Sequence, residues 1–232
     1  MVDVHLKRLI EIGNEDKGYL GSNSYSWTEY VLSENPFLQI DERLDTLNTR
    51  FDRITLFDYC LDSQNDSLNV ISAILSWGGM NRKHGKLLFE KEKFEILCSL
   101  VSDLRNNKFE NRKSAFEAFQ KKRQEGKLTG LGIGYFTKLI CFLAPNLNGY
   151  IMDQWAGKSI NLLLGGEIVV MYNGWVNDEN NSTNYENFCS HIDTLASKLN
   201  CSGIDAEKRI FSVGGVNKGK WRSYLISNYK TL

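Results

Sequence analysis

The sequence has no excess of charge of either sign. Its 232 residues include 28 lysines and arginines against 28 aspartates and glutamates, a formal net charge of zero. This excludes a protein-wide positive field for nucleic acid, so a nucleic-acid site must be a local basic patch. The sequence also lacks an apolar run of roughly eighteen residues and an apolar stretch in residues 1–8. We therefore expect a cytoplasmic protein without a membrane segment.

Histidine and cysteine are few and scattered. The three histidines, His5, His84 and His191, are far apart, and the five cysteines show no metal-ligand spacing. We expect neither a metal centre nor an organic cofactor. The odd number of dispersed thiols is typical of a reduced, cytoplasmic chain.

A hydrophobic fraction of 42% is enough for a sizeable core, and apolar residues recur mostly at helical spacing. Residues 67–77 are apolar nearly all round, which predicts a central buried helix. No linker divides the chain. We predict an all-α fold with two helical lobes, a middle lobe from about 55–150 and a terminal lobe from 1–54 and 151–232, flanking a DNA-binding cleft.

Residues 128–134 read Leu-Thr-Gly-Leu-Gly-Ile-Gly, and we call this segment the glycine turn. Helical patterns precede and follow it. Gly130, Gly132 and Gly134 allow positive φ and close backbone approach, and the second helix would leave its first N–H groups for a phosphate. The pattern predicts a helix-hairpin-helix motif that holds a DNA strand without reading its sequence.

Asp153 lies nineteen residues after Gly134 and opens a helical pattern that runs to Leu164. The ordinary interpretation of aspartate at this position is a helix N-cap. A capping carboxylate is also held ionised and fixed in direction by the helix terminus, so the cap and a catalytic role are compatible.

The glycine turn, the apolar helix after it, Pro145, Gly149 and Asp153 resemble the helix-hairpin-helix, Gly/Pro-Asp DNA glycosylases over about residues 128–164. The runs Gly-Tyr-Phe-Thr-Lys-Leu and Tyr-Ile-Met-Asp-Gln-Trp are most similar to the bacterial group with an 8-oxoguanine glycosylase fold. They are also similar to phage-defence glycosylases that remove α-glucosylated hydroxymethylcytosine. The resemblance implies a catalytic Asp153, double-stranded DNA with a modified base as partner, a monomer, and a structural monovalent cation at the turn.

The same resemblance contains one departure. Gly134 occupies the position of the family's Schiff-base lysine, and Lys138 lies one helical turn further on. Lys138 is either a displaced nucleophile or a phosphate contact. We expect mainly monofunctional excision, in which Asp153 stabilises positive charge on the sugar and an intact abasic site is left. Some glycosylases of the resembling superfamily carry an iron–sulfur cluster bound by four cysteines near the C-terminus. Only two cysteines lie near the C-terminus of this sequence, so we expect no such cluster.

A basic loop, residues 78–84, follows the predicted central helix. In the resembling family this position fills the gap left by an extruded base. We interpret Met80, Asn81 and Arg82 as wedge and partner-reading residues, with Lys83 and His84 near phosphate. The alternative is a helix C-terminus closed by Gly78 and decorated with favourable positive charge.

Further candidates lie outside these two segments. Thr137 is a predicted DNA contact, and the segment 214–222 adds the cations Lys218, Lys220 and Arg222, although it could simply be a loop leading into a last helix. Residues 172–185 are rich in asparagine and are predicted to form a polar loop. Four aromatic residues are possible walls for a flipped base: Trp27, Trp155, Phe211 and Trp221. For Trp27 we favour the alternative of a packing anchor.

These patterns favour a DNA glycosylase, with α-glucosylated hydroxymethylcytosine in phage DNA as the leading substrate. An 8-oxoguanine repair glycosylase/lyase is the first alternative. A non-catalytic helix-hairpin-helix DNA-binding protein is the second, although a pure binder needs no carboxylate beside a negatively charged strand. A helical interaction protein without nucleic acid is the third, and the zero net charge is consistent with it.

Overall fold

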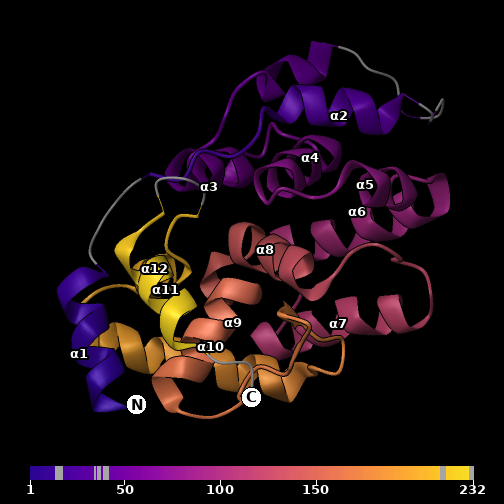
Figure 1. Cartoon of the computed structure of the whole chain (residues 1–232). Coiled ribbons are helices and arrows are strands. Elements are labelled where there is room, and N and C mark those ends of the chain that lie inside the picture. The colour runs from indigo at the N-terminus through magenta and orange to yellow at the C-terminus, as the bar shows by residue number, and fades with distance from the viewer. Residues whose placement is uncertain (14–17, 34, 36–37, 39–41, 215–217, 230–232) are drawn as a thin grey trace. The chain divides into compact units, whose positions relative to one another are not determined.

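The computed structural model describes the chain except residues 14–17, 34, 36–37, 39–41, 215–217 and 230–232. The chain is mostly helical, and its single described sheet has only two short strands, so the all-α prediction is confirmed (Figure 1). The chain divides into two compact units. The middle unit is residues 19–147, and the terminal unit combines residues 1–18 with residues 148–232.

The middle unit is organised around helix α4. All of α4 except its first residue is buried, and it packs against α2, α3, α6, α8 and η1. Asp66 caps its N-terminus by accepting a hydrogen bond from Asn69 N, and the helix ends at Gly78. The predicted central helix is therefore confirmed. The elements of this unit are α2 Ser24–Leu32, η1 Glu42–Leu47, α3 Arg53–Leu61, α4 Ser67–Trp77, α5 Arg82–Leu88, α6 Lys91–Arg105, α7 Arg112–Gln124, α8 Ile133–Leu143 and η2 Pro145–Leu147.

Helices α7 and α8 flank the glycine turn and are joined by aromatic packing. The Phe136 ring of α8 stacks on Phe119 of α7 with centroids 5.4 Å apart, and it meets Phe116 edge-on at 4.8 Å. All three side chains are fully buried. This cluster fixes the positions of the two helices and thus the ends of the turn.

The terminal unit is organised around α9, which contacts α1, α10, α11, α12 and both strands. Inside it, Trp221 Nε1 donates to Ser159 Oγ at 3.0 Å, and that hydroxyl donates to the Ile210 carbonyl at 2.8 Å. These bonds satisfy buried polar groups where α9, α11 and α12 meet. The elements of this unit are α1 Asp3–Ile12, α9 Gln154–Leu164, β1 Met171–Tyr172, β2 Trp175–Val176, α10 Ser182–Leu199, α11 Gly203–Phe211 and α12 Lys220–Asn228.

Two segments differ from expectation. Residues 19–54 group with the middle unit, not with the termini, because α2 packs against α4 and α5. The polar loop expected at residues 172–185 was wrong. Asn173 and Gly174 have φ of 49° and 81° and close a β-hairpin, and the Asn181 side chain starts α10 with a capping box. No helix within the described ranges is long and apolar enough to cross a membrane.

We predict that Phe136→Ala lowers the free energy of unfolding by about 3–5 kcal/mol, because it removes a buried ring from the α7–α8 cluster. Urea unfolding followed by circular dichroism measures the change. Ile54→Ala, at a side chain that is 70% exposed, is the control and should change stability by less than about 0.5 kcal/mol. Equal losses in the two variants would contradict the packing described for this cluster.

Candidate functional site

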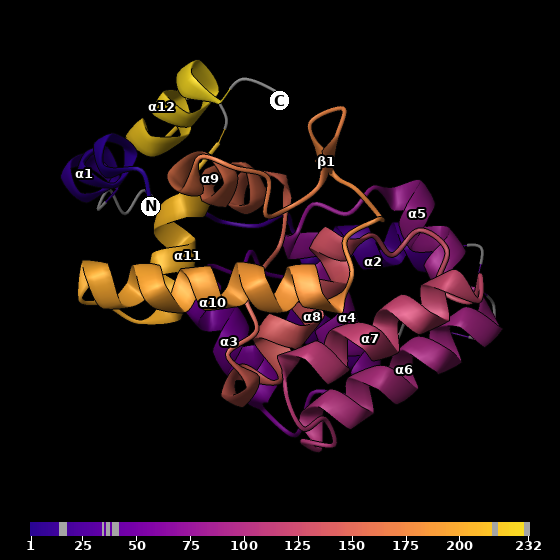
Figure 2. The same ribbon diagram turned by 90° about the horizontal axis from the view of Figure 1, so that it is seen from below.

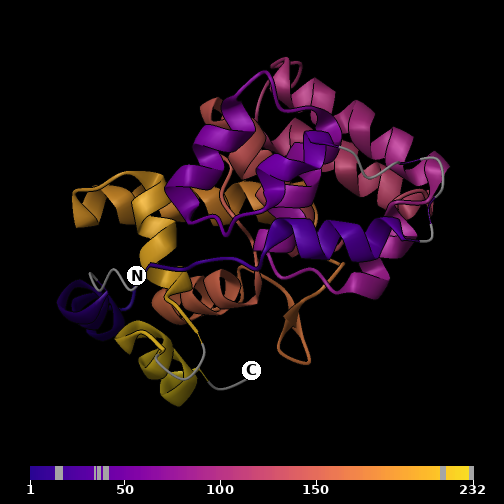
Figure 3. The same cartoon turned by 90° about the horizontal axis from the view of Figure 1, so that it is seen from above.

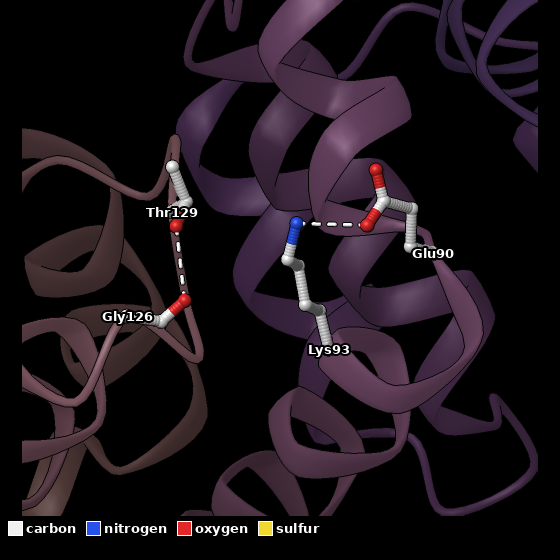
Figure 4. Close-up of polar contacts among 4 residues, drawn as sticks. All are labelled: Glu90, Lys93, Gly126 and Thr129. Atoms are coloured by element: carbon white, nitrogen blue, oxygen red, sulfur yellow. Dashed lines mark hydrogen bonds and ion pairs between the residues drawn. The ribbon is translucent and has the colours of Figure 1, made fainter.

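The glycine turn needs glycine at one of its three predicted positions. Gly130 has a φ of 93°. Gly132 has a φ of −66° and occupies the N-cap position of α8, and Gly134 lies inside the first turn of α8. The expectation of positive φ is therefore correct for Gly130 and wrong for the other two. The turn is tightened by Thr129, whose hydroxyl donates to the Gly126 carbonyl at 3.0 Å (Figure 4).

The start of α8 presents unused backbone donors. Gly132 has no side chain to cap the helix, and its carbonyl accepts from Tyr135 N and Phe136 N. Among the residues that the structure describes, the N–H groups of Ile133 and Gly134 have no acceptor. Such a helix start favours an anion. The carbonyls of Thr129, Gly130 and Leu131 likewise accept no hydrogen bond from the described chain, so they are available to a structural cation, which stays a prediction.

The basic loop lies beside the glycine turn within the middle unit. A Cβ atom built at Gly130 would be 3.3 Å from the His84 carbonyl oxygen, and Tyr135 Oη donates to the Gly79 carbonyl at 3.3 Å. Two segments that are about fifty residues apart in the sequence are therefore neighbours. Their cations and free amides form one candidate surface for a DNA backbone.

The basic loop also borders a groove of about 600 Å³. Asn81, Arg82 and Lys83 are exposed there, Arg82 stands over the Tyr30 ring, and the Asn81 side chain accepts from Lys83 N to start α5. Two predicted site residues instead form packed structure: Met80 and Trp27 are each 3% exposed, and Trp27 Nε1 donates to the Met80 carbonyl. The groove is lined by Ser22, Asn23, Ser26, Trp27, Tyr30, Gly79, Met80, Asn81, Arg82 and Lys83.

The side chains of Thr137 and Lys138 are buried in α8. Thr137 is fully buried and its hydroxyl donates to the Ile133 carbonyl. Lys138 is 6% exposed and its Nζ donates to the Gly134 carbonyl at 2.8 Å. A surface phosphate contact therefore does not fit either side chain. The Lys138 amine instead lies against the backbone of the residue that replaces the resembling family's lysine.

Asp153 is half-buried and caps α9 in the terminal unit. Its Oδ1 accepts hydrogen bonds from Trp155 N at 2.9 Å and Ala156 N at 3.0 Å. Within the described part of the chain, Oδ2 accepts none. One oxygen thus fixes the carboxylate, and the other remains available to a ligand.

Two cations lie near Asp153 and contact the Trp155 ring. The Arg222 guanidinium is 3.8 Å and the Lys158 Nζ is 4.6 Å from the ring centroid. Burial lowers the pKa of Arg222 to about 10, and burial together with the Arg222 charge lowers the pKa of Lys158. The Asp153 charge acts in the opposite direction on both. The cluster is therefore coupled electrostatically around the carboxylate.

Arg222, which the sequence presented as a DNA contact, is only 4% exposed. Its Nε donates to the Phe211 carbonyl, and its Nη2 donates to the Phe211 and Ser212 carbonyls. The guanidinium also lies 5.1 Å from the Phe211 ring centroid. Arg222 therefore holds α11 and α12 together behind Trp155 rather than facing a DNA strand.

The remaining candidates are divided between core and surface. Trp221 is 1% exposed, so its ring cannot be a wall for a base without repacking. Lys218 and Lys220 are exposed and border a hollow of about 350 Å³ beside Arg8. Sequence reasoning missed Lys158 and the groove residues Asn23 and Ser26. The spacing of Lys158 from Asp153 could have indicated the first, whereas nothing in the sequence indicated the groove.

No group of acidic, histidine or cysteine side chains suited to a metal ion occurs in the described residues. Residues 22–211 match the family described as "Putative 8-oxoguanine DNA glycosylase OGG-like protein". The class that fold and sequence define is thus that of DNA glycosylase-like proteins, and DNA is the partner that this class implies. The match covers most of the chain, and the chain belongs to this family. No curated protein and no solved structure matches it.

We predict that Gly130→Ala destabilises the protein by about 1–2 kcal/mol, because alanine disfavours a φ of 93° and its Cβ would crowd the His84 carbonyl. Gly132→Ala is the matched control, since its φ is negative and a Cβ there meets no atom within 4 Å. Thermal unfolding of both variants measures the difference. An equal shift in the melting temperature of the two would contradict the described turn.

Proposed function

We propose that this protein is a DNA glycosylase that hydrolyses the N-glycosidic bond of a modified nucleotide, with Asp153 as its catalytic carboxylate. The observation that carries the proposal is the Asp153 geometry. The Oδ1 atom is fixed by two backbone amides, and Oδ2 accepts no hydrogen bond within the described residues. The family match of residues 22–211 supplies the class of reaction.

The chemistry follows from where charge develops. As the bond from the sugar C1′ to the base breaks, the bonding electrons leave with the base and positive charge builds on the sugar. A fixed carboxylate beside C1′ stabilises that charge without having to reorganise. Water then adds to C1′ and loses a proton, the departing base gains one, and an abasic site remains.

A base inside a duplex must first be extruded, which costs a few kcal/mol of unstacking. The exposed side chains Asn81 and Arg82 of the basic loop support a role in filling the gap and contacting the partner base. The free amides at the start of α8 support a role in holding a backbone phosphate. The phosphate contact is independent of base sequence, whereas the contact with the partner base can discriminate between bases.

We propose water, not an amine, as the nucleophile of base release. Gly134 has no side chain where the resembling family has its lysine, and the Lys138 amine is buried and bonded to the Gly134 carbonyl. An amine nucleophile would have to be unprotonated and reach C1′. The excision step should therefore leave the strand intact.

For the substrate we propose α-glucosylated hydroxymethylcytosine in phage DNA, which gives the protein a defence role. The proposal rests on the resemblance noted for the runs at residues 134–139 and 150–155, and an intact abasic site as product is consistent with destruction of a foreign genome. The description of the family itself favours 8-oxoguanine as the second candidate. Hydrolysis through Asp153 serves either base, because the carboxylate acts on the sugar.

We predict that Asp153→Asn lowers the excision rate by about 100-fold or more while leaving DNA affinity unchanged. Asparagine is also a good N-cap, so α9 should keep its start. Asp66→Asn, which changes the cap of α4 in the same way, is the matched control and should retain activity. Excision by Asp153→Asn at the parent rate would remove Asp153 from the catalytic role.

We also predict that borohydride traps no covalent adduct between the protein and its substrate DNA, because a hydrolytic reaction forms no imine. Gel electrophoresis under denaturing conditions detects such an adduct, with an amine-dependent glycosylase as positive control. Product strands should break only after alkali. An adduct that forms with the parent and vanishes in Lys138→Ala would contradict the proposal.

A further inference from the structure

The β-hairpin of the terminal unit exposes two aromatic side chains. Tyr172 is 66% exposed and Trp175 is 64% exposed. They are direct partners across the two strands, so both lie on the same face of the hairpin. Adjacent exposed aromatics on a folded surface indicate a binding site, because single exposed apolar residues are common and paired large ones are not.

The opposite face of the hairpin lies against α9, so the aromatic pair is on the face directed away from this helix. Met171 and Val176 are the other cross-strand pair and are only partly exposed. A Cβ atom built at Gly157 of α9 would be 3.4 Å from Met171 Sδ, so this face lies against α9. The Asn173–Gly174 turn projects away from the helices of its own unit (Figures 2 and 3).

Buried asparagines anchor the two legs of the hairpin. Asn161 of α9 accepts from Ile168 N and Val169 N and donates to the Val169 carbonyl. Asn180 accepts from Val170 N and donates to the Val170 carbonyl. Both amide side chains are at most 3% exposed. Tyr172 and Trp175 therefore stand on a fixed support, which reduces the conformational entropy lost when they bind a ligand.

A cation lies beside the turn. A Cβ atom built at Gly174 would be 3.3 Å from Lys158 Nζ. Within the described part of the chain, the Lys158 amine has no hydrogen-bond acceptor and no ion pair, and its contact is with the Trp155 ring. The acidic residues of this segment, Glu167, Asp178 and Glu179, lie on the legs and not at the turn. The turn thus has one positive charge on its α9 side, and the aromatic pair lies on the other face of the two strands that the turn joins.

We propose that Tyr172, Trp175 and Lys158 form a nucleotide-binding site, in which an unstacked DNA base stacks on the aromatic pair and its phosphate contacts the lysine. Aromatic faces accept any base, and an ammonium group accepts a phosphate oxygen. The site adjoins α9, the helix that Asp153 caps. This inference rests on the proposed DNA glycosylase function and adds a contact outside the catalytic carboxylate.

The test compares the affinity for a duplex with one bulged, unpaired nucleotide with the affinity for the fully paired duplex. The protein carries Asp153→Asn so that the DNA is not consumed. We expect Trp175→Ala and Tyr172→Ala each to weaken binding of the bulged duplex by about ten-fold. Trp175→Phe should retain that binding, because phenylalanine still stacks. Ile226→Ala, at a 52% exposed side chain of the same unit, is the matched control and should have no effect.

The role of Lys158 is tested separately, by the salt dependence of DNA affinity. Lys158→Ala should reduce the slope of log affinity against log salt concentration by roughly 0.7–0.9, the value for one lost phosphate contact. Lys158→Arg should restore the slope. If both aromatic variants bind the bulged duplex as tightly as the parent protein, while the parent still binds DNA and excises the base, this inference alone is overturned.

Two other outcomes are informative. The same variants are also compared on a duplex that contains α-glucosylated hydroxymethylcytosine. If they lose affinity only for this DNA, the aromatic pair contacts the glucose and the assignment of a base is overturned. A parent protein that binds none of these DNAs would overturn the proposed function itself, and this inference with it.

Discussion

The two hydrogen bonds from the start of α9 to Asp153 Oδ1 are the interaction on which the functional account depends. An N-cap usually only stabilises its helix, by about 1 kcal/mol. Here the cap fixes a half-buried carboxylate and leaves its Oδ2 without a hydrogen bond from the described residues. Burial of α9 against α10, α11 and α12 determines where that carboxylate stands.

The same helix links the other features of the terminal unit. Trp155 follows the cap and contacts Arg222, whose guanidinium bonds to the end of α11. Lys158 extends to the turn of the β-hairpin, and Asn161 anchors one of the hairpin's legs. A shift in the position of α9 would therefore change the contacts of both the cation cluster and the hairpin. The middle unit contributes separate features, namely the glycine turn and the basic loop beside it.

Elements with strong local signals were predictable from the sequence. The buried helix α4 has apolar residues all round between Asp66 and Gly78, and Asp153 precedes a clear helical period. The β-hairpin was missed although Asn173–Gly174 is the strongest turn signal of its kind, because the surrounding asparagines indicated a loop.

Burial of the candidate residues was not predictable. Trp221 and Arg222 stand in polar surroundings along the sequence, and Thr137 is a polar residue within an apolar helix, yet each is at most 4% exposed. The hydrogen-bond acceptor of Thr137 is one helical turn away, whereas that of Trp221, Ser159, is many residues away in the sequence. Spacing alone also could not separate Gly130, which needs a positive φ, from Gly132, which does not.

The most direct measurement is an excision assay on unmodified DNA, 8-oxoguanine-containing DNA and DNA with α-glucosylated hydroxymethylcytosine, each analysed with and without alkali. We expect release of a modified base and strand breaks that require alkali, since hydrolysis leaves an intact abasic site. Breaks confined to the glucosylated DNA would identify the proposed substrate. No base release from any of the three, by a protein that binds them, would contradict the central claim that Asp153 serves a glycosylase.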